Sequence, residues 1–181
     1  MNTKDIVLIG LLAALLKSSQ VILSFLPNIE IVSLLILIFA IRLGAKRTVY
    51  ITVLFSILNI MIWGLSPATI GYFFVWSGYG IVCSIFRKIL NTEIRVALFL
   101  GLFGIIFGGL FAIIYLPMGY SYALSYWING LIFDMVHAVS NFIVGIWVFN
   151  PVLNGFDRAL KMIYGKSYFN NEIKRRKISN E

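Results

Sequence analysis

The residues best suited to chemistry in this chain are polar side chains that lie within long apolar stretches. Asp134, His137 and Asn141 follow a spacing of three and then four residues, so on a helix that turns about 100° per residue they share one face. Lys17 lies within a separate apolar stretch. An ionisable group at bilayer depth is costly unless it is paired or hydrated. We therefore expect these side chains to bind a ligand or to form a structural hydrogen-bond network, and Lys17 and Asp134 to be a possible ion pair.

Aromatic residues form a second stripe. Tyr72, Trp76, Tyr79 and Cys83 recur at helical spacing. Such stripes usually serve packing, but Trp76 and Tyr79 lie too deep for an interfacial belt, and each carries a polar group that needs a partner. The two stripes predict a site for a planar organic ligand between them. Two further residues complete the predicted substrate-binding set, which is Glu30, Tyr72, Trp76, Tyr79, Trp127, Asp134, His137 and Asn141.

Motifs for enzymatic chemistry are absent from the sequence. It contains no Walker motif, no G-x-S-x-G and no H-E-x-x-H. Asp134 and His137 could form an acid–base pair, but no nucleophile accompanies them. One histidine and one cysteine are too few for most zinc sites. We therefore expect no catalytic residues, no metal and no cofactor.

The composition defines the class of protein that must position these residues. Of the 181 residues, 60% are hydrophobic and only 12% are charged, whereas soluble domains carry about 25% charged residues. The mean hydropathy is +0.94. These values argue against a soluble enzyme and against a disordered chain. They predict one membrane domain.

Six apolar runs predict an all-α integral membrane protein. The runs are continuous rather than alternating, which argues against a β-barrel. A six-helix domain is expected over residues 1–150, followed by an amphipathic helix along the membrane surface and a basic tail over 151–181. The predicted spans cover approximately residues 6–26, 29–43, 48–65, 69–86, 96–116 and 127–149.

We interpret the formal net charge of +8 as a consequence of how the chain is oriented in the membrane. Every Lys and Arg except Lys17 falls in the two termini or in the second and fourth connections between spans. The positive-inside rule then places both termini in the cytoplasm. Because these cations flank apolar runs and do not form one solvated face, we expect no nucleic-acid partner.

The chain resembles the substrate-binding subunit, or S component, of an energy-coupling factor (ECF) transporter. The resemblance is carried mainly by the run from Phe133 to Asn141, with its Asp-x-x-His-Ala-x-x-Asn pattern, followed by Asn150-Pro151. Gly10-x-x-x-Ala14 is similar to the small-residue motif with which that family docks on its coupling subunit.

The resemblance implies a multi-pass protein of the bacterial cytoplasmic membrane that captures a vitamin or similar small organic molecule from outside. A transmembrane coupling subunit and two ATPases would then act with it to deliver the substrate inward.

Two questions stay open from the sequence. A structural membrane protein of the MreD-like cell-shape type has similar size and span number and is the alternative to a transport subunit. The ligand is also open, because Glu30 and Asp134 suit a cationic ring, whereas neutralisation of Asp134 by Lys17 would favour a neutral one. Thiamine-like, pyridoxine-like, flavin-like and cobalamin-like molecules all remain possible.

Overall fold

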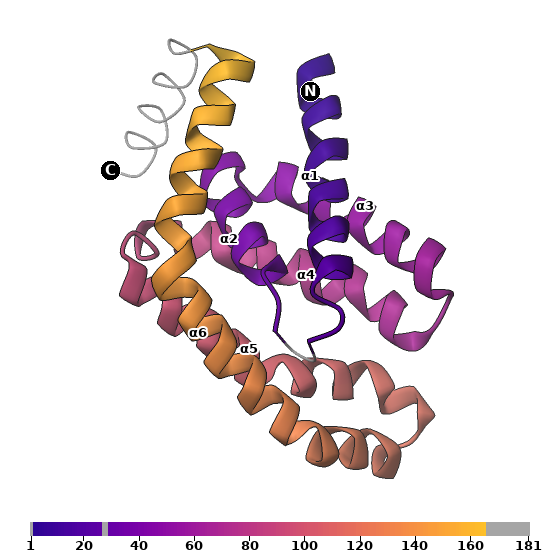
Figure 1. The fold of residues 1–181 in the computed structure, drawn as a ribbon. Coiled ribbons are helices and arrows are strands. Elements are labelled where there is room, and N and C mark those ends of the chain that lie inside the picture. Colours follow the sequence, from indigo (N-terminus) through magenta and orange to yellow (C-terminus); the bar gives the residue numbers. More distant parts are fainter. Residues whose placement is uncertain (1, 27–28, 166–181) are drawn as a thin grey trace.

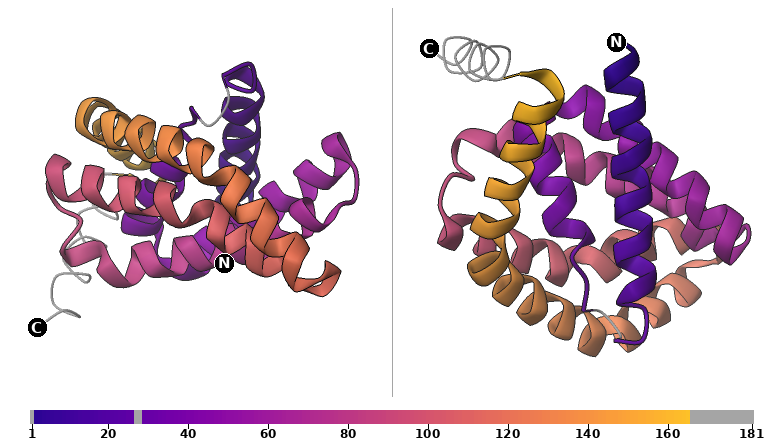
Figure 2. Two further views of the ribbon diagram at one scale, coloured as in Figure 1. Left: turned by 90° about the horizontal axis from the view of Figure 1, so that it is seen from below. Right: turned by 45° about the horizontal axis from the view of Figure 1, so that its top comes forward.

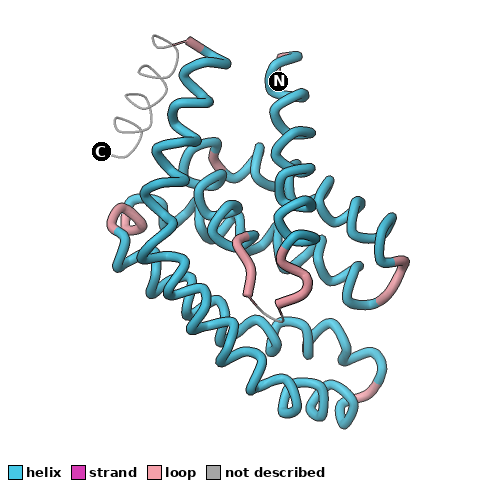
Figure 3. The backbone as a smooth tube through the Cα atoms, viewed as in Figure 1, coloured by secondary structure: helices cyan, strands magenta, loops and turns pink. Residues whose placement is uncertain are grey.

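The computed structural model describes residues 2–26 and 29–165, and within these residues it is built from helices without strands (Figures 1 and 3). Single 3-10 turns, Phe86–Lys88 and Leu116–Met118, follow the fourth and fifth helices. The predicted all-helical class is confirmed for these residues. The helices are α1 (Thr3–Ile22), α2 (Val32–Leu43), α3 (Ala45–Trp63), α4 (Pro67–Ile85), α5 (Glu93–Tyr115) and α6 (Tyr120–Tyr164).

Helix α2 differs from the other five, which are each long and apolar enough to cross a membrane. It has 12 residues, a length of about 18 Å against a hydrocarbon core of about 30 Å. Most of its residues are buried, and it packs against α1, α3, α4 and α6. The predicted second span is therefore a short helix enclosed by longer ones. Its sequence resembles a span because burial in protein and burial in lipid both favour apolar residues.

Large apolar side chains cover much of the outer surface. Met61, Phe74, Ile132 and Trp147 are among the most exposed residues of the molecule. Soluble monomers rarely expose apolar surface on this scale. Together with the five long apolar helices, this surface indicates a membrane-embedded protein.

Local sequence signals explain where several helices begin. Asn2 accepts a hydrogen bond from the Asp5 backbone N–H, and the Asp5 carboxylate accepts one from the Asn2 backbone in return. Ser66 and Thr69 form the equivalent capping box ahead of α4. These reciprocal bonds satisfy N–H groups that the first helical turn leaves free. Gly44, with a φ of 80°, ends α2 and begins α3 in a backbone conformation that other residues rarely adopt.

Helices α5 and α6 pack closely as an antiparallel pair (Figures 1 and 2). A Cβ atom on Gly104 would lie 2.6 Å from the Ala138 backbone, and one on Gly145 would lie 2.5 Å from the Ala97 Cα. Small residues thus allow the two backbones to approach.

Helix α6 extends beyond the predicted sixth span in both directions. Its 45 residues measure about 67 Å, and the helix bends along its length (Figure 1). It starts at Tyr120 rather than at Trp127, so most of the predicted loop before this span is helical. It also continues through Pro151 to Tyr164. Pro151 is accommodated within the helix, where it removes one backbone hydrogen bond.

The last turns of α6 return to the start of α1, so the two described ends of the chain lie at one end of the molecule (Figure 2). We call this the terminal end and define it by Asp5, Arg42, Arg47, Asp157 and Tyr164. Asp5 accepts a 2.5 Å hydrogen bond from the Tyr164 hydroxyl and pairs with Arg47 at 3.1 Å. Asp157 accepts two bonds from Arg42, at 2.6 and 2.9 Å.

The segment after residue 151 was predicted to lie along the membrane surface. Part of its apolar side packs on the protein, where the Phe156 ring lies 5.2 Å from that of Phe39 in α2. The predicted basic tail over residues 166–181 lies outside the described residues.

Candidate functional site

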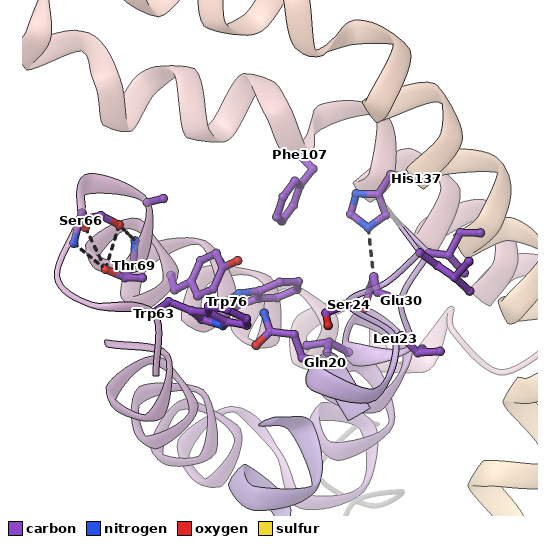
Figure 4. A pocket seen from close by; sticks show the side chains of 15 residues that line it. Gln20, Leu23, Ser24, Glu30, Trp63, Ser66, Thr69, Trp76, Phe107 and His137 are labelled. Atoms are coloured by element: carbon purple, nitrogen blue, oxygen red, sulfur yellow. Dashed lines mark hydrogen bonds and ion pairs between the residues drawn. The ribbon is translucent and has the colours of Figure 1, made fainter. Parts of the chain in front are cut away.

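A cavity of about 440 Å³ lies between the α1–α2 linker and helices α3 to α6 (Figure 4). Its volume falls within the range of small-molecule sites, about 300–1,000 Å³. We call the half of the molecule that contains it the cavity end. The cavity is lined by Gln20, Leu23, Ser24, Leu26, Ile29, Glu30, Val32, Trp63, Ser66, Ala68, Thr69, Tyr72, Trp76, Phe107 and His137.

Four of the predicted binding residues meet in this cavity. Glu30 comes from the linker, Tyr72 and Trp76 come from α4, and His137 comes from α6. The Trp76 ring lies edge-on to Tyr72 at 6.0 Å and tilted against Phe107 at 5.6 Å. Such arrangements are favourable for aromatic pairs. The aromatic stripe of α4 therefore forms one wall of a cavity that the predicted polar stripe of α6 also reaches.

Glu30 is fixed at the edge of the cavity by two partners. Its Oε1 lies 3.2 Å from His137 Nε2 (Figure 4). Its Oε2 accepts a 2.8 Å bond from the Ser33 backbone N–H. Burial raises the pKa of Glu30, but the hydrogen bond and charge of His137 and the bonds from Ser33 outweigh it, so the pKa lies below its usual value. Glu30 is thus an engaged carboxylate that ties the linker to α2 and α6.

Lys17 does not pair with Asp134, and the predicted ion pair is wrong. The Lys17 ammonium donates to Asn59 Oδ1 at 2.8 Å and to Gln20 Oε1 at 2.9 Å. Asp134 Oδ1 instead accepts a 3.0 Å bond from the Gly108 backbone N–H. Helix α1 packs on α3, whereas α6 packs on α5. Lys17 and Asp134 were expected at similar depths in the membrane, but depth does not show which helices are neighbours.

Asp134 lines a second pocket, of about 520 Å³, next to the first. Its other walls include Tyr126 and Phe133 of α6, and Phe107 lines both pockets. Gly108 makes room for the carboxylate, because a Cβ there would collide with it. Asp134 thus lines the second pocket, whereas Glu30 and His137 line the first.

The remaining predicted binding residues do not line the cavity. Tyr79 lies one turn below Trp76 and stacks on Phe103 at a ring distance of 3.9 Å. Asn141 is fully buried deeper along α6. Trp127 lies against Gly109 in an apolar groove between α5 and α6. These three residues were placed on the correct helices, but not in the cavity.

Several buried polar atoms around the cavity have no hydrogen-bond partner within the described residues. They include Trp76 Nε1 and His137 Nδ1 from the cavity lining, together with atoms of Ser33, Tyr79, Asp134 and Asn141. An unpartnered buried donor or acceptor costs about 1–3 kcal/mol. No group of three His, Cys, Asp or Glu side chains within the described residues is placed to hold a metal ion. The cavity offers aromatic surfaces and hydrogen-bonding groups, which suit ligand binding.

Sequence reasoning missed part of the lining, including Gln20, Ser24, Trp63, Thr69 and Phe107. It also missed Asn59, which accepts a hydrogen bond from Lys17 and does not itself line the cavity. Gln20 and Asn59 did carry a usable signal, because each is a polar residue within an apolar run. Phe107 carried none, because it is one of many apolar residues in its helix.

No family model matches the chain, and no curated protein or solved structure matches it either. Its function is therefore inferred from the cavity and from the residues around it.

Proposed function

We propose that this chain is the substrate-binding S component of an ECF-type importer and captures a vitamin or similar small organic molecule. The observation that carries the proposal is the 440 Å³ cavity, with aromatic walls and unpartnered polar atoms, inside a membrane-embedded helical protein. A structural protein of the MreD-like type has no need of such a cavity. The aromatic rings bind the flat part of the molecule, and the polar groups select it.

The proposed topology has six passages through the membrane domain, of which the second is the short enclosed helix α2, with both termini in the cytoplasm of a bacterial cell. It is supported by the distribution of Lys and Arg along the chain. The two described ends lie together at the terminal end, and Arg42 and Arg47 lie there too. Lys17 is about 18 Å along α1 from Asp5, at 1.5 Å per residue. The cavity end is then the outer end, where it can receive substrate from outside.

The face of α1 that carries Gly10 and Ala14 is the proposed docking site for the coupling subunit. A Cβ on Gly10 would meet no atom within 4 Å, and Ala14 is exposed. Val7 and Leu11 beside them are 55% and 61% exposed. Small residues flanked by exposed apolar ones permit close approach of a partner helix. Two ATPases joined through the coupling subunit would supply the energy for delivery.

The proposal is tested by purifying the tagged protein from cells of its native host under mild conditions. Mass spectrometry of the extracted small molecules is expected to show one organic compound enriched over a mock purification. Proteomics of the same sample is expected to show a membrane subunit and ATPase subunits. If neither a compound nor an ATPase is enriched, the transport proposal is wrong and a structural role is favoured.

A further inference from the structure

Lys17 places a positive charge beside the cavity with no acid to balance it. The side chain is 5% exposed, and within the described residues no carboxylate lies within ion-pair distance of it. Its neighbours are two amide oxygens and the Trp63 ring, 5.0 Å from the ammonium nitrogen. These groups stabilise a cation but do not neutralise it.

The contacts of Lys17 also fix the orientation of Gln20 in the cavity wall. A lysine ammonium has only donors, so the amide oxygen of Gln20 must face Lys17. The amide N–H₂ group is then the end of Gln20 that can donate elsewhere. Asn59 is oriented in the same way, because its N–H₂ group donates to the Phe55 carbonyl oxygen at 2.9 Å while its oxygen accepts from Lys17.

The carboxylate that lines the cavity, Glu30, is already engaged. Both oxygens of Glu30 have partners, His137 and the Ser33 backbone N–H. The Trp76 indole N–H, in contrast, can only donate, and it has no acceptor among the described residues although Trp76 is 3% exposed. Gln20 and Trp76 lie next to each other in the view of Figure 4, on the side away from His137. The protein thus offers donors and a positive charge on that side, which a ligand that carries acceptors can meet.

The cavity walls restrict the shape of that ligand. Trp63, Tyr72, Trp76 and Phe107 all line the cavity, and aromatic walls bind flat rings by offset or edge-on stacking. The other acidic residue of the region, Asp134, lines the neighbouring pocket beyond Phe107 and already holds the Gly108 N–H.

We propose that the cavity binds a planar aromatic anion, such as a ring that carries a carboxylate, with the negative group on the Gln20 side near Lys17. This inference rests on the proposed function, since it names the chemical class of that substrate. It replaces the cationic or neutral ring expected from sequence, because Glu30 is engaged by His137 and Lys17 is not paired with Asp134.

Binding to the purified full-length protein in lipid nanodiscs tests this inference. Matched acid and amide pairs serve as probes: nicotinate with nicotinamide, and 4-aminobenzoate with 4-aminobenzamide. The cations thiamine and pyridoxamine complete the panel. We expect at least one acid to bind at least tenfold more tightly than its amide, as measured by calorimetric titration of the unmodified protein.

Substitution of Lys17 locates the charge effect. Lys17→Gln is expected to weaken binding of the acid at least tenfold and to leave the amide within twofold. Lys46→Gln, at the start of α3, is the control and should change neither. Tighter binding of the amides or cations, or an equal loss of acid and amide in Lys17→Gln, overturns the inference and leaves the proposed function standing. Failure of every compound in the panel to bind, together with no compound retained through purification, overturns the proposed function itself.

Discussion

At the terminal end of the molecule, buried and half-buried polar groups find their partners within the protein. Asp5 and Asp157 each contact an arginine, and the Tyr164 hydroxyl donates to Asp5. At the cavity end, polar groups that are at least as buried remain without partners, among them Trp76 Nε1 and His137 Nδ1. In the described part of the chain, none of the buried side-chain nitrogen or oxygen atoms that lack a hydrogen-bond partner belongs to the five residues that define the terminal end.

This difference separates two uses of polar residues within one membrane-embedded bundle. Paired charges at the terminal end link α1, α2, α3 and the last turns of α6, so they hold helices together. Unpartnered groups at the cavity end add nothing to folding and carry a desolvation cost. Binding of a ligand that supplies the missing hydrogen-bond partners would explain why the protein keeps these costly polar groups. Substitutions at the two ends should therefore affect different measurements.

The largest effect is expected at the α5–α6 contact, which holds His137 against the cavity. In Gly104→Ala the new methyl group meets the Ala138 backbone at 2.6 Å, and backbone cannot move aside easily. We expect a loss of about 3 kcal/mol in stability, at the upper end for an overpacked site, with loss of ligand binding. Thermal unfolding in detergent measures it. Gly101→Ala is the matched control, because its Cβ would lie at an ordinary contact distance of 3.5 Å from α6. Equal melting temperatures for the two variants would contradict this account of the α5–α6 contact.

The next effect is confined to the terminal end. Asp157→Asn leaves the half-buried Arg42 without its carboxylate and should lower stability by about 1–2 kcal/mol, between the values for exposed and buried pairs. Ligand affinity should stay within twofold, since the cavity is distant. The Arg42→Gln/Asp157→Asn double variant should lose less stability than the sum of the single losses. A large loss of affinity in Asp157→Asn would show that the two ends are coupled.

At Trp76 we expect a smaller effect, and one on ligand affinity rather than on stability. Trp76→Phe keeps an aromatic ring in the wall but removes the indole N–H, which has no partner within the described residues. Affinity for the retained ligand should fall about 3- to 10-fold, the value of one neutral hydrogen bond of about 0.5–1.5 kcal/mol, with little change in melting temperature. Trp147→Phe, at a site 76% exposed on the outer surface, is the control. A change in stability without a change in affinity would make Trp76 a packing residue.

The smallest effect on the isolated protein is expected on the exposed face of α1. Gly10→Leu and Ala14→Leu should leave both folding and ligand affinity unchanged, because this face contacts no other part of the described chain closely. They should reduce co-purification of the coupling subunit, since bulk prevents close helix approach. Val139→Leu, on the exposed side of α6, controls for added apolar surface. Normal complex formation in both α1 variants would place docking elsewhere.

Sequence alone predicted the helical class, because long apolar runs in membrane proteins leave little choice of secondary structure. It could not show that α2 is enclosed by the other helices, since a buried helix and a spanning helix have the same apolar composition. It also misplaced the start of α6, which begins at Tyr120 rather than at Trp127.

Only part of the site could be predicted from the sequence, for a related reason. Periodicity places residues on one face of a helix, and that was sufficient for Trp76 and His137, whose helices both border the cavity. It carries no information about which helices are neighbours. Lys17 and Asp134 therefore appeared to be partners, although α1 packs on α3 and α6 on α5. The pairing of Glu30 with His137 joins a linker to a distant helix and could be found only from the fold.

The most direct test of the central claim is an experimental structure of the protein with the small molecule that it retains through purification. The account predicts that the molecule lies in the cavity at the cavity end, with its ring against Trp76 and Phe107 and beside the linker that carries Glu30. Density for the molecule in the pocket of Asp134 or in the groove of Trp127, with this cavity empty, would contradict it.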